Sequence, residues 1–253
     1  MNGFGRPPGY GTAVSLNNRI DNLVVGSSNM SRRKRGRLYD VVLTNLRHSD
    51  PSPDMPTLHR LSILLASARP TGNGVGLVAW LKKHHLESLP ASKDWSIDVK
   101  NLATPPLPLG VVTSNTLPAM IANGQYESAA VREWSTYVRD STAFVVVTPE
   151  YNWSYPGELK NAFDIIYSEW NDKPVALLTY GVQGGKTAAA HLRTVMGSGL
   201  KMKIVSEVNI NLPGPMVHAA ERVSDNPAFL DAYSADVRKA LSDLLDASKI
   251  KKL

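Results

Sequence analysis

The chain has 253 residues, of which 43% are apolar, 20% charged and 7% aromatic, which is the composition of an ordinary globular protein. It contains no cysteine, so disulfides, thiolate metal sites and a cysteine nucleophile are excluded. The histidines show no metal-binding spacing, and no run of about 18 uncharged apolar residues occurs, so we expect neither a metal site nor a membrane-spanning helix.

The net charge of +6 is concentrated at the start of the chain, because residues 1–54 hold eight basic and four acidic residues. Residues 1–57 are rich in Gly, Pro, Ser, Asn and Arg, and we expect them to form a basic, disordered N-terminal extension. The cluster from Arg32 to Arg37 is also typical of nuclear localisation, which stays open beside the cytoplasmic location that we expect. An organellar presequence and a start of translation at Met55 are further alternatives.

Residues 58–250 show a different pattern, in which apolar runs alternate with helical segments. Strands are predicted at 61–67, 96–102, 143–149, 173–181 and 201–212, and helices at 74–89, 125–141, 156–170, 184–199 and 226–248. Near-continuous apolar strands are typical of a parallel sheet with helices on both faces. With right-handed crossovers, this pattern predicts a single α/β domain with a doubly wound five-stranded parallel sheet of order 2-1-3-4-5.

Three predicted loops carry unusual chemistry, and all three lie at the same edge of this sheet. They are ASARPTGNG (66–74), TPEYNWSYPG (148–157) and TYGVQGG (179–185). In an open parallel sheet, ligands bind outside the carboxyl ends of the strands where the strand order reverses. We therefore predict a ligand site where these loops meet.

The first loop has hydroxyls, Arg69 and glycines at the start of a helix, and this combination is typical of a phosphate site. A structural role as turn and N-cap residues is the alternative. The glycines at 72, 74 and 76 do not have the G-x-G-x-x-G spacing of dinucleotide sites. The sequence GGKT at 184–187 is no P-loop, because Tyr180 stands where that motif requires its first glycine.

The second and third loops favour a flat aromatic ligand. Tyr151 and Trp153 are large rings in a loop, where they suit stacking on a planar ring; packing between subunits is the alternative. The glycine-rich third loop offers backbone N–H groups to a heterocycle. A phosphate site, a stacking loop and a backbone-amide loop together indicate a mononucleotide with a large planar ring, and flavin mononucleotide fits best.

At these motifs the sequence resembles the NADPH-dependent FMN reductases of flavodoxin-like fold, a family that includes quinone, azo-dye and chromate reductases. Residues 66–69 are similar to the family's G-S-x-R, and residues 179–185 to S-Y-G-x-x-G-G. Residues 148–164 match T-P-E-Y-N-x-S/G-x-P-x-x-L-K-N-A-x-D almost completely. Two departures are Ala66 in place of the usual glycine, and GNGVG (72–76) in place of a Ser/Arg-rich continuation, which leaves the second phosphate contact unassigned.

The resemblance, which covers about residues 58–212, implies cofactors, partners and site residues. The cofactors are FMN and NADPH or NADH, the partner is a small-molecule electron acceptor, and the assembly is a homodimer or homotetramer. The FMN phosphate is expected at Ser67, Arg69, Thr71, Gly74 and Val75. The ribityl chain and isoalloxazine are expected at Pro149, Glu150, Tyr151 and Asn152, and the pyrimidine end at Tyr180, Gly181, Gln183 and Gly184.

The implied function is an FMN-containing NAD(P)H-dependent oxidoreductase that passes hydride through the flavin to quinones, FMN or similar acceptors. Such an enzyme needs no catalytic acid or base from the protein, and none is predicted. The first alternative is a flavodoxin-like electron carrier or redox-sensing protein that binds FMN without NAD(P)H turnover. The second is a nucleic-acid-associated protein acting through the N-terminal basic cluster, which the nearly balanced charge of the folded part does not favour.

Overall fold

The computed structural model describes residues 59–67, 69–87, 95–105, 107, 109–110, 114–122 and 124–249. The expected N-terminal extension, its basic cluster and the alternative start at Met55 lie outside the described residues. None of the helices within the described ranges combines the length and apolar character needed to span a bilayer.

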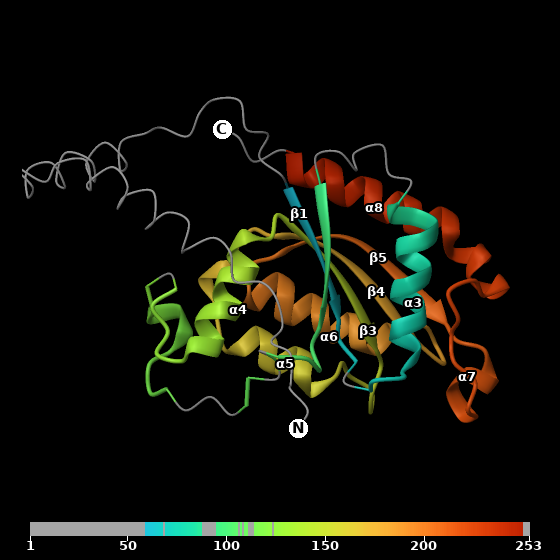
Figure 1. Ribbon diagram of the computed structural model, residues 1–253, viewed down its shortest axis with the longest axis horizontal. Helices are drawn as coiled ribbons and strands as arrows, with labels where there is room; N and C mark the ends of the chain where they lie inside the picture. The colour runs from blue at the N-terminus through green and yellow to red at the C-terminus, as the bar shows by residue number, and fades with distance from the viewer. Residues whose placement is uncertain are drawn as a thin grey trace, which may run out of the picture. The chain divides into compact units, whose positions relative to one another are not determined.

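Five strands form one parallel sheet in the predicted order β2-β1-β3-β4-β5 (Figure 1). The strands are β1 (His59–Leu65), β2 (Trp95–Asn101), β3 (Ala143–Pro149), β4 (Pro174–Gly181) and β5 (Lys203–Asn211). β3 is buried along its whole length, as expected for a central strand covered on both faces. Because the order reverses between β1 and β3, the loops after β1, β3 and β4 meet at one edge of the sheet.

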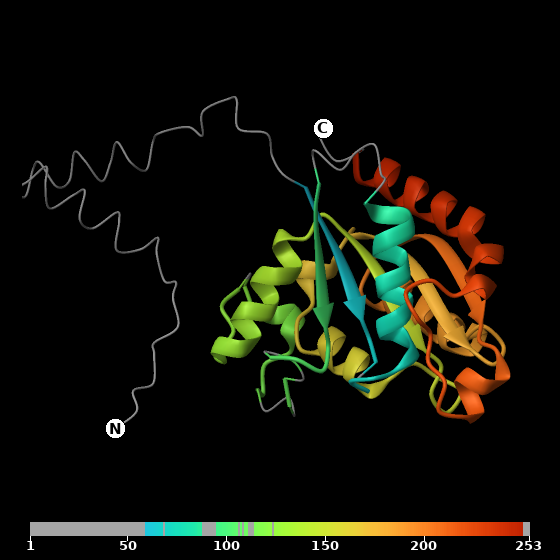
Figure 2. The same cartoon turned by 45° about the vertical axis from the view of Figure 1, so that its right-hand side comes forward.

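Helices cover both faces of the sheet (Figures 1 and 2). α3 (Asn73–Leu81) and α8 (Ser234–Lys249) pack on one face, and α4 (Ala129–Asp140), α5 (Gly157–Asp164) and α6 (Lys186–Leu192) on the other. Alternate strand residues supply the two cores: Leu61 and Ile63 belong to the α3–α8 side, and Leu64 to the opposite side. The doubly wound α/β architecture is therefore confirmed.

The helices differ from the predictions mainly at their ends. Those after β1 and β4 end in π-helical turns, Lys82–Leu86 and Arg193–Gly199, and the helix after β5 begins as a 3-10 segment, Ala228–Tyr233. Residues 213–225, where no element is predicted, contain the short helix α7 (Gly214–His218). It lies near the carboxyl ends of the strands and beside the start of α3 (Figure 1).

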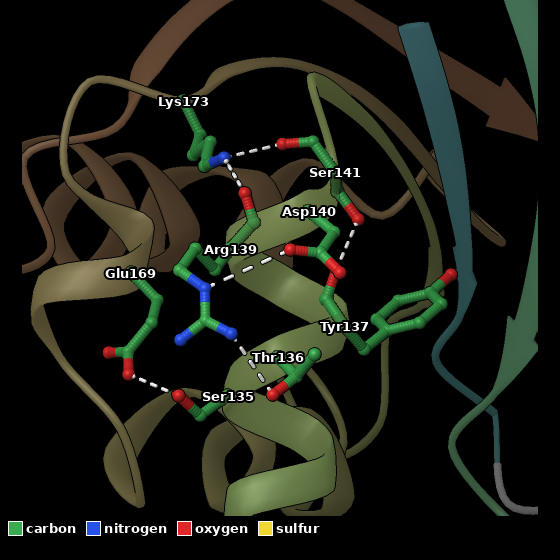
Figure 3. A network of polar contacts seen from close by, with 8 residues as sticks. All are labelled: Ser135, Thr136, Tyr137, Arg139, Asp140, Ser141, Glu169 and Lys173. Atoms are coloured by element: carbon green, nitrogen blue, oxygen red, sulfur yellow. Dashed lines mark hydrogen bonds and ion pairs between the residues drawn. The ribbon is translucent and has the colours of Figure 1, made fainter. Parts of the chain in front are cut away.

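The helix predicted over 156–170 is shorter than expected, because it ends at Asp164 and a 3-10 turn follows. In this turn Glu169 points into the protein and is only 5% exposed. Its carboxylate accepts a hydrogen bond from the Ser135 hydroxyl (Figure 3) and another, of 3.1 Å, from the Tyr126 hydroxyl. A buried carboxylate needs such donors, and they fix the segment after α5 against α4.

Figure 3 also shows how the C-terminal end of α4 is closed. Lys173 Nζ donates to the backbone carbonyl oxygens of Arg139 and Ser141, and the Ser141 hydroxyl donates to the carbonyl of Tyr137. These bonds satisfy carbonyl groups that the last turn of a helix leaves without an intrahelical partner. The entry to β4, where Lys173 lies, is thereby joined to the end of α4.

Candidate functional site

A cavity of about 430 Å³ lies where the loops after β1, β3 and β4 meet. This volume is within the range of about 300–1,000 Å³ that is typical of small-molecule sites. The predicted site residues that line it are Arg69, Thr71, Pro149, Glu150, Tyr151, Tyr180, Gly181 and Gln183. The three predicted loops therefore do border one cavity, together with a fourth segment that follows β5.

The first two loops are held together by Ser67 and Tyr151. The Ser67 hydroxyl lies 3.0 Å from the Tyr151 hydroxyl and accepts a hydrogen bond of 3.3 Å from the Arg69 backbone N–H. The Arg69 guanidinium lies 4.7 Å from the centre of the Tyr151 ring, within cation–π distance. Ser67 is buried behind this contact, so it positions Tyr151 and Arg69 and does not line the cavity.

The start of α3 borders the cavity at Gly72 and Asn73. Gly72 is the N-cap of α3 and provides no side-chain cap; the Val75 N–H donates to the Gly72 carbonyl at 3.1 Å, and the Gly74 N–H donates to the Tyr180 hydroxyl. Arg69 and Thr71 line the same cavity, and no carboxylate within the described residues pairs with Arg69. A guanidinium without a described carboxylate partner, beside the positive end of a helix dipole, is a donor group that suits a phosphate.

Gly74 is needed because Tyr180 lies against the first turn of α3. A Cβ atom at Gly74 would lie 2.7 Å from the Tyr180 hydroxyl and 2.6 Å from Leu65 Cδ1, which is closer than real Cβ contacts. Burial raises the pKa of Tyr180 well above its usual range, with the nearby Tyr151 adding to the effect. The hydroxyl therefore stays protonated and serves as a neutral hydrogen-bonding group. Val75, also predicted, lies in the same turn but outside the cavity lining.

The second loop makes a tight turn that sends its aromatic residues in different directions. Tyr151 and Ser154 exchange two backbone hydrogen bonds of 2.7 and 3.0 Å around Asn152 and Trp153, whose φ angles are +49° and +62°. Positive φ at both central residues is the pattern of a type I′ turn. Trp153 lines the cavity and is 70% exposed, whereas Tyr155 packs against the α4–α5 core. Asn152, at the tip of the turn, does not line the cavity.

Glu150 connects the second loop to the third. Its carboxylate accepts hydrogen bonds from the backbone N–H groups of Thr187 (3.0 Å) and Ala188 (3.3 Å), in the first turn of α6. Its own backbone N–H donates to the Tyr180 carbonyl at 3.0 Å. α6 has no side-chain cap from its own N-cap residue, so Glu150 supplies one from a neighbouring loop. Glu150 thus lines the cavity, and its carboxylate is hydrogen-bonded to the first turn of α6.

The third loop is rigid for reasons that involve β5. The Thr179 hydroxyl donates to the Gly184 carbonyl and accepts from Asn209 Nδ2, both at 2.8 Å. Gly184 has a φ of +72°, and a Cβ atom there would lie 2.8 Å from Asn209 Cβ. Gly184 therefore allows the turn to pack on β5 and lies away from the cavity lining. Gly181 and Gln183, in the same loop, line the cavity.

The fourth segment is the part of the site that sequence reasoning missed. It contributes Leu212, Met216, Val217 and Arg222 to the cavity lining. Asn73, in the first turn of α3, holds it: Asn73 Nδ2 donates to the Met216 carbonyl at 2.8 Å, and Asn73 Oδ1 accepts from the Val223 N–H at 3.1 Å. No local periodicity reveals such a segment, and its only signal in the sequence is the glycine-rich start of α3 that receives it.

Comparisons with known proteins give the family. A model of the NADPH-dependent FMN reductase family matches residues 59–215, which is more than half of the chain. The chain belongs to this family. The resemblance to the NADPH-dependent FMN reductases is thereby confirmed.

Proteins from several organisms are similar to this chain in sequence. The chain is 29% identical over 195 residues to the NAD(P)H-dependent FMN reductase LOT6 of Saccharomyces cerevisiae, covering 76% of this chain and 100% of the relative. It is 35% identical over 152 residues to an NAD(P)H-dependent FMN reductase of Schizosaccharomyces pombe, covering 60% and 74%. A quinone reductase of Escherichia coli is 37% identical over 90 residues, covering 32% and 47%. The chain is thus an oxidoreductase of the NAD(P)H-dependent FMN and quinone reductase type.

The fold agrees with solved structures. The flavoenzyme NAD(P)H:(acceptor) oxidoreductase FerB of Paracoccus denitrificans superimposes with a TM-score of 0.50 at 20% identity, over 75% of this chain and 98% of that protein. At this identity the likeness shows the fold alone. Together with the strand order, it confirms the expected flavodoxin-like architecture.

One departure from the family pattern has a simple structural explanation. Ala66, which stands where the NADPH-dependent FMN reductases usually have glycine, is fully buried. Its backbone N–H donates to the Val147 carbonyl at 3.0 Å, and its methyl group belongs to the core on the α4 side. The extra methyl therefore adds to the core and does not narrow the cavity.

Proposed function

We propose that this chain binds FMN in the cavity and passes reducing equivalents from NADPH or NADH to a small-molecule acceptor such as a quinone or free FMN. The observation that carries the proposal is the convergence of three loops, including the nearly complete family motif at 148–164, on one cavity of suitable size. The named functions of the matched relatives agree with it.

The described residues fit the parts of FMN. Arg69 and Thr71 would hold the phosphate at the N-terminal end of α3, whose dipole favours an anion. Tyr151 and Trp153 would border the isoalloxazine on one side, and the backbone from Gly181 to Gln183 on another. A Cβ atom at Gly181 would lie no closer than 3.5 Å to any other atom, so the third loop is open enough for a planar ring.

The protein's part in catalysis is to position and not to exchange protons. Bound FMN supplies the chemistry: NAD(P)H is oxidised to NAD(P)⁺ by hydride loss, and a quinone gains two electrons and two protons, one of them from water, to become a hydroquinone. Glu150 caps α6 and Ser67 orients Tyr151, so both loops are fixed before a ligand arrives. This pre-organisation lowers the cost of binding.

We further propose a homodimer or homotetramer in which the cavity mouth faces a second copy. Trp153 (70% exposed) and Val182 (60% exposed) both lie at the cavity, and large apolar side chains in such positions suit a partner surface or an acceptor ring. Sedimentation analysis of the wild type and of a Trp153→Ser, Val182→Ser variant measures this. An unchanged oligomer in the variant would exclude this surface as the interface.

We propose that residues 58–250 are the FMN-binding domain and that residues 1–57 are a basic extension dispensable for turnover. Deleting residues 1–57 should leave NAD(P)H oxidation unchanged. We propose a cytoplasmic location; fluorescent fusions with and without the cluster from Arg32 to Arg37 distinguish it from a nuclear one.

The deciding experiment is a flavin titration of the purified full chain, followed by anaerobic addition of NADPH or NADH and then of a quinone. We expect stoichiometric FMN uptake, bleaching of the flavin absorption by the nicotinamide, and its return with the quinone. A protein that takes up no FMN and oxidises no NAD(P)H contradicts the proposal. FMN uptake without bleaching would instead support the electron-carrier alternative.

A further inference from the structure

Arg222 is a second arginine at the cavity, and nothing in the family motifs predicts it. It comes from the segment between β5 and α8, yet it lines the same cavity as Arg69 and Thr71. The loop after β1 supplies fewer phosphate-binding side chains than the family pattern. Its tract GNGVG (72–76) lacks the Ser/Arg-rich side chains common in the family, so one phosphate contact is unassigned.

The contacts of Val223 place Arg222 next to the start of α3. The Val223 N–H donates to Asn73 Oδ1, in the first turn of the helix, at 3.1 Å. The Val223 carbonyl oxygen lies only 1.8 Å from where a Cβ atom at Gly76 would be, so glycine alone allows this approach. Because Val223 is hydrogen-bonded to Asn73 in the first turn of α3, the neighbouring Arg222 lies near the N-terminal end of this helix.

Among the described residues, the recorded contacts of Arg222 are with backbone carbonyl groups and not with a carboxylate. Its described hydrogen bonds run from one guanidinium nitrogen to the backbone carbonyls of Ala219 (3.0 Å) and Glu221 (2.6 Å). No ion pair to Arg222 occurs within the part of the chain that the structure describes. Among the lining residues Glu150 carries the acidic side chain, and its carboxylate is engaged at α6. Two guanidinium groups therefore line one cavity, and no carboxylate among the described residues forms an ion pair with either.

We infer that Arg222 provides the second cationic contact to the FMN phosphate, in place of the side chains absent from the loop after β1. This inference rests on the proposed function. A phosphate monoester carries close to two negative charges, which matches two guanidinium groups beside a helix N-terminus. The two carbonyl contacts of Arg222 use one nitrogen and leave the rest of its donor fork for the ligand.

The test measures FMN and riboflavin binding to the full-length apoprotein by quenching of flavin fluorescence. Riboflavin has the same ring and ribityl chain but no phosphate. For Arg222→Gln we expect the FMN dissociation constant to rise about tenfold, as for loss of one charge-assisted hydrogen bond, and riboflavin binding to stay unchanged. Arg222→Lys should recover part of the loss. The matched control is Arg132→Gln, another exposed arginine bonded to two backbone carbonyls but outside this cavity.

Four results would overturn the inference. An equal loss of FMN and riboflavin affinity would mean that Arg222 only holds its segment in place. Unchanged FMN affinity with a raised KM for NADPH, but not for NADH, would mean that it binds the 2′-phosphate of the nicotinamide substrate. A wild-type protein that binds no FMN would overturn the proposed function together with this inference, whereas FMN binding without an Arg222 effect overturns the inference alone.

Discussion

Replacing Gly76 with alanine tests whether the segment after β5 really depends on the glycine-rich start of α3. A Cβ atom would lie 1.8 Å from the Val223 carbonyl oxygen and 2.5 Å from its carbonyl carbon, so the segment must move away. Exposing Val223, now 6% exposed, costs about 2 kcal/mol, and losing its hydrogen bond to Asn73 costs about 1 kcal/mol. Alanine's higher helix propensity returns about 1 kcal/mol. The expected net destabilisation is about 2 kcal/mol.

Urea unfolding of the full chain, followed by circular dichroism, measures this change. The matched control is Gly197→Ala, because a Cβ atom at Gly197 would lie 3.9 Å from Ile204 Cδ1, an ordinary contact. Gly197→Ala should leave the free energy of unfolding unchanged or raise it by up to about 1 kcal/mol. If Gly76→Ala unfolds at the same urea concentration as the wild type or at a higher one, the close approach of Val223 does not stabilise the native fold.

Two further predictions concern buried polar side chains. Burial lowers the pKa of His85 from its ordinary value of 6.5, with Arg238 and His84 adding to the effect, so below pH 6.5 the unfolded chain binds a proton that the folded one does not. The contribution of His85 to stability should therefore be complete above pH 6.5 and fall with pH below it, and His85→Phe should flatten this part of a stability–pH profile. Glu169→Ala removes the acceptor of the buried Tyr126 hydroxyl and should destabilise by about 2–3 kcal/mol in urea unfolding. The loss should be smaller in a Tyr126→Phe background, and additive losses would contradict a shared network.

The sheet was predictable because its signal is local. β3 runs over Ala143–Pro149, the residues predicted, since a strand buried on both faces must be apolar throughout and a proline ends its hydrogen bonding. The helix predicted over 156–170 ends at Asp164, and in the 3-10 turn that follows Glu169 points inward to Ser135 and Tyr126. Both partners lie more than thirty residues away along the chain, so no periodicity within the helix can show the break.

The site divides in the same way between local and distant causes. The motif at 148–164 places Tyr151 at the cavity, and a single loop sequence is enough to predict that. Gly74 and Gly76 are also noted in the sequence, but there they are interpreted as part of a phosphate-binding loop. Their structural reason is the approach of Tyr180 and Val223, which come from other elements. A glycine in the sequence indicates that another group packs closely against the backbone, but it does not identify the residue that supplies that group.

The affinity for the FMN phosphate should therefore depend on how stably the fourth segment packs on α3. If Arg222 contacts the FMN phosphate, it can do so only while Val223 remains on α3, because the two residues are adjacent. Gly76→Ala and Arg222→Gln should then weaken FMN binding through the same lost guanidinium contact, and the double variant should bind FMN about as weakly as the weaker single variant. Fluorescence titration of the four proteins with FMN and riboflavin measures the coupling. Multiplying losses would show that the glycine and the arginine act independently, and that the segment's docking does not position Arg222 for the phosphate.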